Sequence, residues 1–168
     1  MNAEELRALQ APLKARYRDD SLAGRVTLRA SGSLGAEAIT CKVDTGRALV
    51  EAGLHPATGG DGSATCSGDM LLEALAACAG VTCRAVATAL GVPLRGGTVT
   101  AEGDLDFRGT LGVARDARVG FENIRVVAEL DGEMSAEQRA TLLGLTERYC
   151  VVLQTLRSPP RLEIEAPA

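Results

Sequence analysis

The sequence predicts an α+β protein whose antiparallel sheet is covered by two apolar helices. Segments that alternate polar and apolar residues, as strands of a half-buried sheet do, occur in pairs on either side of a long apolar segment with helical character. The expected strands are residues 24–30, 37–43, 97–108, 120–130 and 161–165, and the expected helices are residues 3–17, 68–90 and the stretch that follows Ser135.

The chain of 168 residues has the length of one ordinary domain with a short extension. Residues 3–17 carry leucines at helical spacing with charged residues between them, which predicts an amphipathic helix. We therefore expect residues 1–20 to form an N-terminal helical extension and residues 21–168 to form the main domain. The charged N-terminus lacks the apolar segment of a secretory signal, so we expect a cytoplasmic protein.

Residues 24–30 and 37–43 flank Ser31-Gly-Ser-Leu-Gly35, whose small residues favour a turn, so the three segments predict a β-hairpin. Residues 45–68 are rich in Gly, Ala and small polar residues, with Gly59-Gly-Asp-Gly62 at their centre. This composition predicts a mobile or functional loop. The segment lacks the Gly-Lys-Ser/Thr ending of a phosphate-binding P-loop.

Residues 68–90 predict the central helix, with Ser67 as its N-cap and Gly91 as its stop signal. Apart from Glu73 its first half is apolar nearly all round, as expected of a helix in the middle of a fold. Its longest apolar stretch, residues 70–83, is too short and too interrupted to span a bilayer. We therefore expect no membrane contact.

Residues 97–108 and 120–130 alternate as two further strands, and Asp131-Gly132 favours a turn after them. Ser135 and Gln138 then have the spacing of a capping box.

The helix that begins there is expected to run as one long element until Pro159-Pro160, because its apolar residues keep the helical period through Leu156. Residues 161–165 then alternate as a short final strand.

The composition argues against two classes of function. The formal net charge is −4 and the chain has only two Phe and two Tyr, so neither a basic surface nor a stacking platform for nucleic acid is expected. With a single histidine, His55, and no Cys-x-x-Cys pair, we expect no metal site, and no motif indicates a cofactor. His55 is instead a candidate pocket residue.

Five cysteines, at positions 41, 66, 78, 83 and 150, are an odd number in a chain without a visible secretory signal, which favours structural or reactive thiols over a disulfide scaffold. Cys78 and Cys150 both lie in apolar helical segments far apart in the chain. If the two meet, they indicate thiol redox chemistry. Cys41 and Cys83 are expected to fill space, and Cys66 is a further thiol that could pair.

A series of motifs resembles the successive landmarks of the OsmC/Ohr family, in the family's order, over residues 22–166. The motifs are Gly59-Gly-Asp-Gly62, Asp69-Met-Leu-Leu-Glu-Ala-Leu-Ala-Ala-Cys78, Gly103-Asp-Leu-Asp106, Val119-Gly-Phe-Glu-Asn-Ile124 and Glu147-Arg-Tyr-Cys150. The resemblance implies an OsmC-like α+β fold in which two protomers intertwine as a homodimer, with active sites at the dimer interface.

The resemblance also implies a function, the thiol-dependent reduction of organic hydroperoxides. The characterised branches of the family use two cysteines, whose positions match Cys78 as the attacking thiol and Cys150 as the resolving thiol. The implied reaction gives a sulfenic acid on Cys78 and then a Cys78–Cys150 disulfide, which an external dithiol reduces. The alternative is a non-enzymatic member that binds a small apolar molecule at the dimer interface or acts as a redox sensor.

An apolar environment raises the pKa of a thiol, so Cys78 needs a nearby positive group to react. Cys78 lies nearly three turns inside its helix, too far for that helix's own N-terminus to help. We therefore expect an arginine to supply the charge, and the candidates are Arg25, Arg29 and Arg47.

The peroxidase branches hold that arginine with the Glu of a Pro-Glu pair, which stands ten residues before the cysteine. Here Ser67 and Gly68 occupy the two positions, which favours the non-enzymatic alternative. Asp69 and Glu73 are the candidate carboxylates that remain on the helix.

Overall fold

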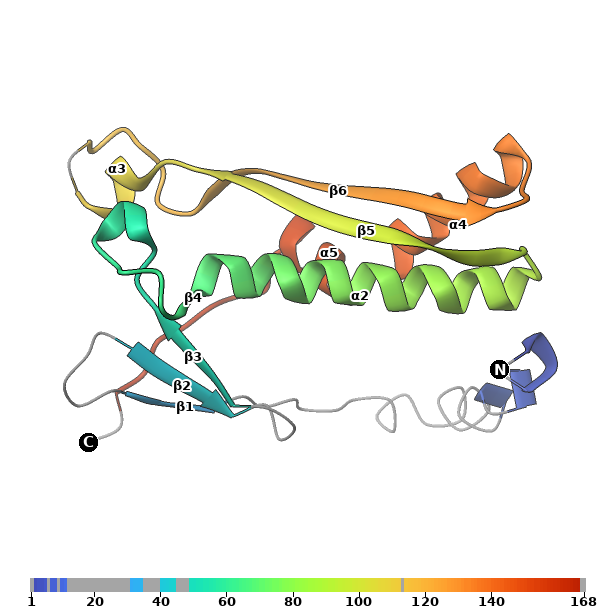
Figure 1. The fold of residues 1–168 in the computed structure, drawn as a ribbon, viewed down its shortest axis with the longest axis horizontal. Coiled ribbons are helices and arrows are strands. Elements are labelled where there is room, and N and C mark those ends of the chain that lie inside the picture. The colour runs from blue at the N-terminus through green and yellow to red at the C-terminus, as the bar shows by residue number, and fades with distance from the viewer. Residues whose placement is uncertain are drawn as a thin grey trace. The chain divides into compact units, whose positions relative to one another are not determined.

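The computed structural model describes residues 2–5, 7–8, 10–11, 31–34, 40–44, 49–112 and 114–166, with the backbone alone at 31–34 and 40–44. The chain forms two compact units, whose elements Figure 1 labels. Unit 1 comprises Met1–Leu9, Ala74–Thr100 and Val127–Ala168, and unit 2 comprises Gln10–Glu73 and Ala101–Val126. In the described part of the predicted N-terminal helix, residues 3–5, 7–8 and 10–11 are helical.

Unit 2 contains a four-stranded sheet in which β1 pairs antiparallel with β2, β2 antiparallel with β3, and β3 parallel with β4. The strands are β1 (Ser31–Leu34), β2 (Thr40–Asp44), β3 (Leu49–Gly53) and β4 (Thr65–Cys66). Strand β2 overlaps the prediction for residues 37–43, and residues 24–30 lie outside the described residues.

Two predictions in this unit are wrong. Residues 31–34, predicted as a turn, form β1, and residues 45–68, predicted as a loop, contain β3, β4 and a 3₁₀ turn, η1 (Pro56–Thr58). Small residues favour turns locally, but cross-strand hydrogen bonds can hold the same residues in a strand, because strand preference depends strongly on context.

The central helix α2 spans Ser67–Leu90 and begins one residue earlier than predicted. It ends before Gly91, whose φ of +67° is a backbone conformation that favours glycine. Among the described helices it is the one long and apolar enough to cross a membrane by length and composition, so the judgement made on residues 70–83 alone does not hold for the whole helix. Core helices of water-soluble proteins pass the same test.

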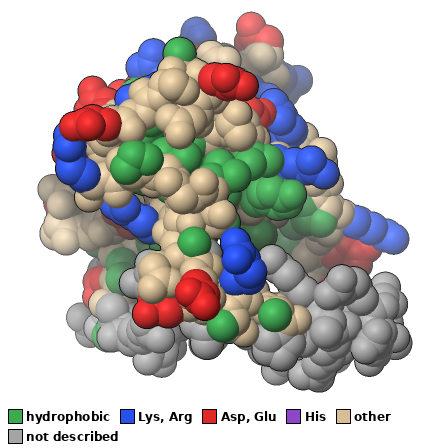
Figure 2. Space-filling model, turned by 90° about the vertical axis from the view of Figure 1, so that its right-hand side faces the viewer, with side chains coloured by type: hydrophobic (Ala, Val, Ile, Leu, Met, Phe, Trp, Pro, Cys, Tyr) green, Lys and Arg blue, Asp and Glu red, His purple; other side chains and the backbone are tan. Residues whose placement is uncertain are grey.

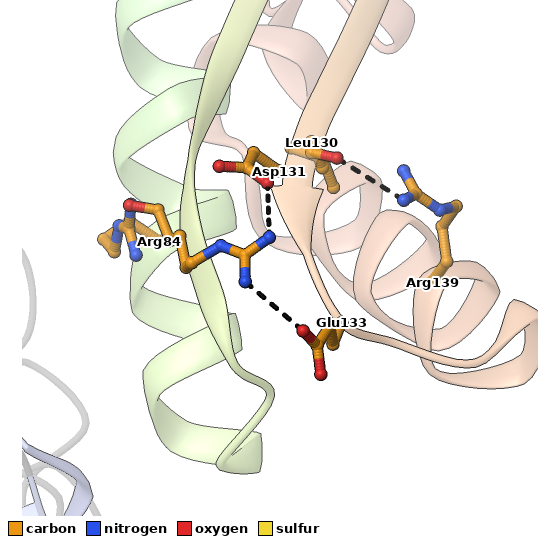
Figure 3. Close-up of polar contacts among 6 residues, drawn as sticks. Arg84, Leu130, Asp131, Glu133 and Arg139 are labelled. Atoms are coloured by element: carbon orange, nitrogen blue, oxygen red, sulfur yellow. Dashed lines mark hydrogen bonds and ion pairs between the residues drawn. The ribbon is translucent and has the colours of Figure 1, made fainter.

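A long two-stranded sheet is formed by β5 (Leu94–Leu105) and β6 (Phe121–Gly132), which lie side by side in Figure 1. The strands are antiparallel, since Gly132 lies against Pro93 whereas Gly97 lies against Glu129. Arg95 links them through ion pairs to Asp131 at 3.0 Å and Glu133 at 3.5 Å (Figure 3).

The predicted ends of these strands need correction. Strand β6 continues through Asp131-Gly132, predicted as a turn, because it remains beside β5 to that point. Phe107 and Arg108, predicted as strand residues, belong to a short helix, α3 (Phe107–Thr110). The Asp106 side chain accepts the backbone N–H of Arg108 at 2.9 Å, and such a cap competes with strand hydrogen bonding.

The predicted capping box is confirmed, because Ser135 Oγ accepts the N–H of Gln138 at 3.1 Å and Gln138 Oε1 accepts the N–H of Ser135 at 2.9 Å. The prediction of one long helix is wrong. The segment divides at Cys150 into α4 (Ala136–Tyr149) and α5 (Val151–Arg157). Residues 159–166 have no regular secondary structure, so the predicted final strand at 161–165 is absent.

The core of unit 1 lies between α2, β5, β6 and α4. Four side chains on α2 are buried at intervals of four residues, which places them on one face: Leu75, Ala79, Cys83 and Ala87. Cys83 is only 3% exposed and packs in a cluster with Val92 and with Leu142 of α4, as expected of a space-filling cysteine. Arg139 of α4 donates to the Leu130 carbonyl of β6 (Figure 3).

The contact between β5 and β6 predicts that Gly97 tolerates no side chain. Its φ is +141°, and a Cβ there would overlap the Glu129 carbonyl oxygen. Gly97→Ala should lower the free energy of unfolding by about 1–3 kcal/mol in urea titrations. Gly96→Ala is the matched control, with nothing within 4 Å of its Cβ, and should change stability by less than about 0.5 kcal/mol. Equal losses for the two variants would contradict the close approach of the strands at Gly97.

Candidate functional site

Cys78 of α2 and Cys150 between α4 and α5 meet within unit 1. The two side chains lie close enough that each shifts the pKa of the other, and both thiols are free. Cys150 is fully buried, with 0% of its surface exposed, whereas Cys78 is partly exposed. The two cysteines that the sequence singled out therefore form one dithiol site.

The break at Cys150 gives this site its hydrogen-bond donors. Cys150 is extended, with φ of −71° and ψ of 106°, and stands directly before α5 without a side-chain cap on that helix. The first backbone N–H groups of a helix have no partner within it. Here the N–H groups of Val151, Val152 and Leu153 lie near the two sulfurs and lower the pKa values of the thiols.

Side chains on either side of the break hold it in place. Arg157 of α5 forms an ion pair with Glu147 of α4 at 2.6 Å, and Gln154 Nε2 donates to the Glu147 carbonyl at 2.7 Å. The N–H of Gln154 donates to the Cys150 carbonyl at 2.9 Å, the first backbone bond of α5. The orientation of α5 relative to α4 is thus fixed by the two contacts of Glu147.

The surroundings of Cys78 favour its thiolate. Burial raises the pKa of Cys78, but the N–H of Val152, the thiol of Cys150, the N–H of Val151 and the hydroxyl of Thr82 all lower it. Together these donors outweigh burial, so the pKa of Cys78 lies below that of an ordinary cysteine. The thiolate is the reactive form of cysteine, which makes Cys78 the better nucleophile of the pair.

The surroundings of Cys150 favour its neutral thiol. Burial is the largest influence and raises the pKa of Cys150, and the adjacent Cys78 sulfur raises it further. The N–H groups of Leu153 and Val152 oppose this shift without cancelling it. The pKa of Cys150 therefore lies above that of Cys78, so Cys78 is the first of the two thiols to lose its proton as pH rises.

We expected an arginine to lower the pKa of Cys78, but in the described part of the chain other groups lower it. None of the largest influences on the pKa of Cys78 comes from a described arginine. Backbone N–H groups of α5 take that role, from a helix other than the one that carries Cys78. The candidates Arg25, Arg29 and Arg47 lie outside the described residues.

The other predicted site residues lie in unit 2. His55 caps η1, with Nδ1 accepting the N–H of Ala57 at 3.0 Å, and its ring stacks on Phe107 at 4.7 Å. Asp69 and Glu73 are exposed on α2. His55 therefore has a local structural role. In the described residues no three His, Cys, Asp or Glu side chains gather as a metal site.

A cavity of about 360 Å³ opens beside α2 in unit 1. Small residues line it on both sides, Ala76, Ala77 and Gly80 on α2 and Gly96 and Gly97 on β5. Small side chains leave space between a helix and a strand, and this cavity could hold part of an apolar ligand.

Comparison with known proteins agrees with the fold. The sequence model of the OsmC-like protein family matches residues 60–165. The OsmC-like protein of Mycoplasma pneumoniae superposes with a TM-score of 0.67 at 15% identity, over 80% of this chain and 89% of that one. No curated protein sequence matches the chain.

Two further structural neighbours are named organic hydroperoxide resistance proteins. The Legionella pneumophila protein has a TM-score of 0.62 at 19% identity, over 79% of this chain and 90% of that one. The Elizabethkingia anophelis protein has a TM-score of 0.63 at 17% identity, over 80% of this chain and 91% of that one. The predicted α+β fold is confirmed by these structures.

The opposed pKa shifts predict that the two thiols react in a fixed order as pH rises. Because the pKa of Cys78 is lowered and its side chain is partly exposed, iodoacetamide should alkylate Cys78 at lower pH than an ordinary cysteine. Cys150, whose pKa is raised and whose side chain is fully buried, should react far more slowly in the folded protein. Peptide mass mapping after timed alkylation of the reduced, folded protein measures both rates. Buried Cys83 is the internal control and should stay protected until the protein unfolds. Faster alkylation of Cys150 than of Cys78 would reverse the assignment.

Proposed function

Because this chain belongs to the OsmC-like protein family, we propose that it is a thiol-dependent peroxidase that reduces organic hydroperoxides. Cys78 is the attacking thiolate in this proposal and Cys150 the resolving thiol. The observation that carries the proposal is the adjacent cysteine pair, in which the pKa of Cys78 is lowered and that of Cys150 is raised. The names of two structural neighbours support the class of substrate.

The proposed reaction has three steps. The Cys78 thiolate attacks the terminal oxygen of the hydroperoxide, the O–O bond breaks, and the leaving alkoxide takes a proton to give the alcohol. This step leaves a sulfenic acid on Cys78. The Cys150 sulfur then attacks the Cys78 sulfur, an S–S bond forms, and water leaves. An external dithiol reduces the disulfide by thiol–disulfide exchange and is itself oxidised to a disulfide.

The position of the pair suits the second and third steps. Cys150 already lies beside Cys78, so the sulfenic acid can be resolved without a large movement of either helix. Cys78 is the more exposed sulfur. The external dithiol is therefore expected to attack Cys78 and to release Cys150 as the leaving thiol.

We further propose that the protein acts as a cytoplasmic homodimer. Three apolar or aromatic side chains of unit 1 are largely exposed, Val81 at 72%, Tyr149 at 57% and Val151 at 71%, and two of them directly flank Cys150 in the sequence. In the view of Figure 2, hydrophobic side chains gather in a band across the middle of one face, with charged side chains around it. Exposed apolar surface of this kind is typical of protein interfaces.

A second candidate function is the binding of a small apolar molecule without peroxide reduction. The cavity beside α2 supports it, as do Ser67 and Gly68 in place of the Pro-Glu pair. The peroxidase proposal is preferred because the donors around Cys78 favour its thiolate without that pair.

One equivalent of an organic hydroperoxide such as cumene hydroperoxide should convert the reduced protein rapidly to a Cys78–Cys150 disulfide, seen by mass mapping. Cys78→Ser should be inert, because it lacks the nucleophile. Cys150→Ser should stop at a sulfenic acid that a dimedone probe captures. Cys83→Ser is the matched control on α2 and should react like the wild type. Slow or indiscriminate oxidation would favour the binding function.

The dimer proposal predicts a mass of two chains in sedimentation equilibrium. Val81→Glu should shift the protein toward the monomer, because burying a carboxylate at an interface is costly. Leu111→Glu, which places the same charge at an exposed leucine of unit 2, should leave the mass unchanged. A wild-type protein that sediments as a monomer would contradict the proposal.

A further inference from the structure

The cavity beside α2 combines an apolar lining with one positive charge. Besides the small residues of α2 and β5, its walls include Leu94 and Val99 of β5 and Leu130 of β6. Arg84 of α2 also lines it, and it is the charged residue among the described residues that do so. The cavity therefore offers a surface for an apolar chain and a guanidinium group for an anion.

Backbone groups of β5 hold the Arg84 guanidinium at this cavity. Its Nη1 donates to the Leu94 carbonyl, and its Nη2 donates to the Arg95 carbonyl at 3.4 Å. Both acceptors are neutral, and Arg84 forms no ion pair in the described part of the chain. A guanidinium has five N–H donors in a fixed plane. Arg84 thus keeps donors and an uncompensated charge for a carboxylate, a group that arginine binds well.

The cavity lies on the side of α2 away from the reactive thiol. Ala76 and Gly80 are each two residues from Cys78, which is about 160° around a helix of 3.6 residues per turn. Ala77 and Arg84 lie about 100° and 120° from Cys78 by the same geometry. A molecule in the cavity therefore contacts a different face of α2 from the one that carries the Cys78 sulfur.

The dimensions of the cavity set the size of its ligand. Ala76 and Arg84 are eight residues apart on α2, a rise of about 12 Å. The Arg84 side chain leans toward the helix N-terminus and shortens this span. An extended chain advances about 1.2 Å per bond, so roughly eight to ten bonds reach from one end to the other. The volume of about 360 Å³ lies in the range of small-molecule sites.

We propose that this cavity is a second ligand site, separate from the dithiol, that binds a medium-chain carboxylate. The carboxylate pairs with Arg84, and the apolar chain lies between the small residues of α2 and those of β5. Removal of each methylene from water favours binding, and the charge at one end fixes the direction of the chain. The inference does not rest on the proposed peroxidase reaction, because the site lies away from Cys78.

Octanoate is the probe, and isothermal titration calorimetry on the full chain measures its affinity. Arg84→Met removes the charge and should weaken octanoate binding by about threefold to tenfold, as expected for a partly exposed ion pair. Octan-1-ol has the same chain without the charge, so its binding should be unaffected by this variant. Arg95→Met is the matched control, because Arg95 pairs with Asp131 and Glu133 and does not line the cavity.

A second variant fills the cavity. Gly96 lies two residues from Leu94 on β5, so their side-chain directions share one face, and a Cβ on Gly96 meets nothing within 4 Å. Gly96→Leu should therefore occupy the cavity and weaken both octanoate and octan-1-ol by about tenfold or more. Gly144→Leu, at an equally open position on α4, should bind both as the wild type does. If Gly96→Leu does not fold, the comparison of Arg84→Met with Arg95→Met decides.

Equal octanoate affinity in the wild type and Arg84→Met would overturn the proposal. Competition between octanoate and a hydroperoxide for Cys78 would also overturn it, because the ligand would then lie at the dithiol. No octanoate binding, together with loss of the dimer in Gly96→Leu, would assign the cavity to a second copy of this chain. A protein that binds octanoate as expected but forms no Cys78–Cys150 disulfide with hydroperoxide would contradict the proposed function alone.

Discussion

The dithiol site depends on the first backbone N–H groups of α5, which are free because the helix is interrupted at Cys150. In a continuous helix the N–H groups of Val151 and Val152 would bond to carbonyls four residues earlier. They would then be unable to reach the sulfur of Cys78. The extended backbone at a single residue thus creates the donors that stabilise a thiolate on a different helix.

The same interaction also serves the start of α5. The first N–H groups of a helix have no partner within it, so the start of α5 needs an acceptor. The Cys78 sulfur supplies it from α2, and the bonds from Glu147 to Arg157 and Gln154 hold the two helices at the required angle. The start of α5 and the chemistry of Cys78 therefore both require an electron-rich sulfur beside the first turn of α5.

This arrangement bears on the departure from the peroxidase branches at Ser67 and Gly68. A carboxylate that orients an arginine is one means of lowering the pKa of a buried thiol. Backbone N–H groups and a hydroxyl are another, and they carry no formal charge that must itself be removed from water. The absence of the Pro-Glu pair is consequently a weaker argument against a reactive Cys78 than the sequence suggested.

Local patterns in the sequence were sufficient for the family, the central helix, the capping box of Ser135 and the choice of Cys78 and Cys150, because each rests on residues close together in the chain or on a motif. The break between α4 and α5 was not predictable, since the apolar period continues across Cys150 without a Gly or Pro. Strands β1, β3 and β4 were missed for a related reason, as pairing with neighbouring strands holds residues that a reading of Gly-rich and small-residue composition assigned to turns and loops. Only the tertiary structure brings the two sulfurs together and supplies the N–H groups of α5, because a donor from another helix leaves no periodic trace in the sequence around Cys78.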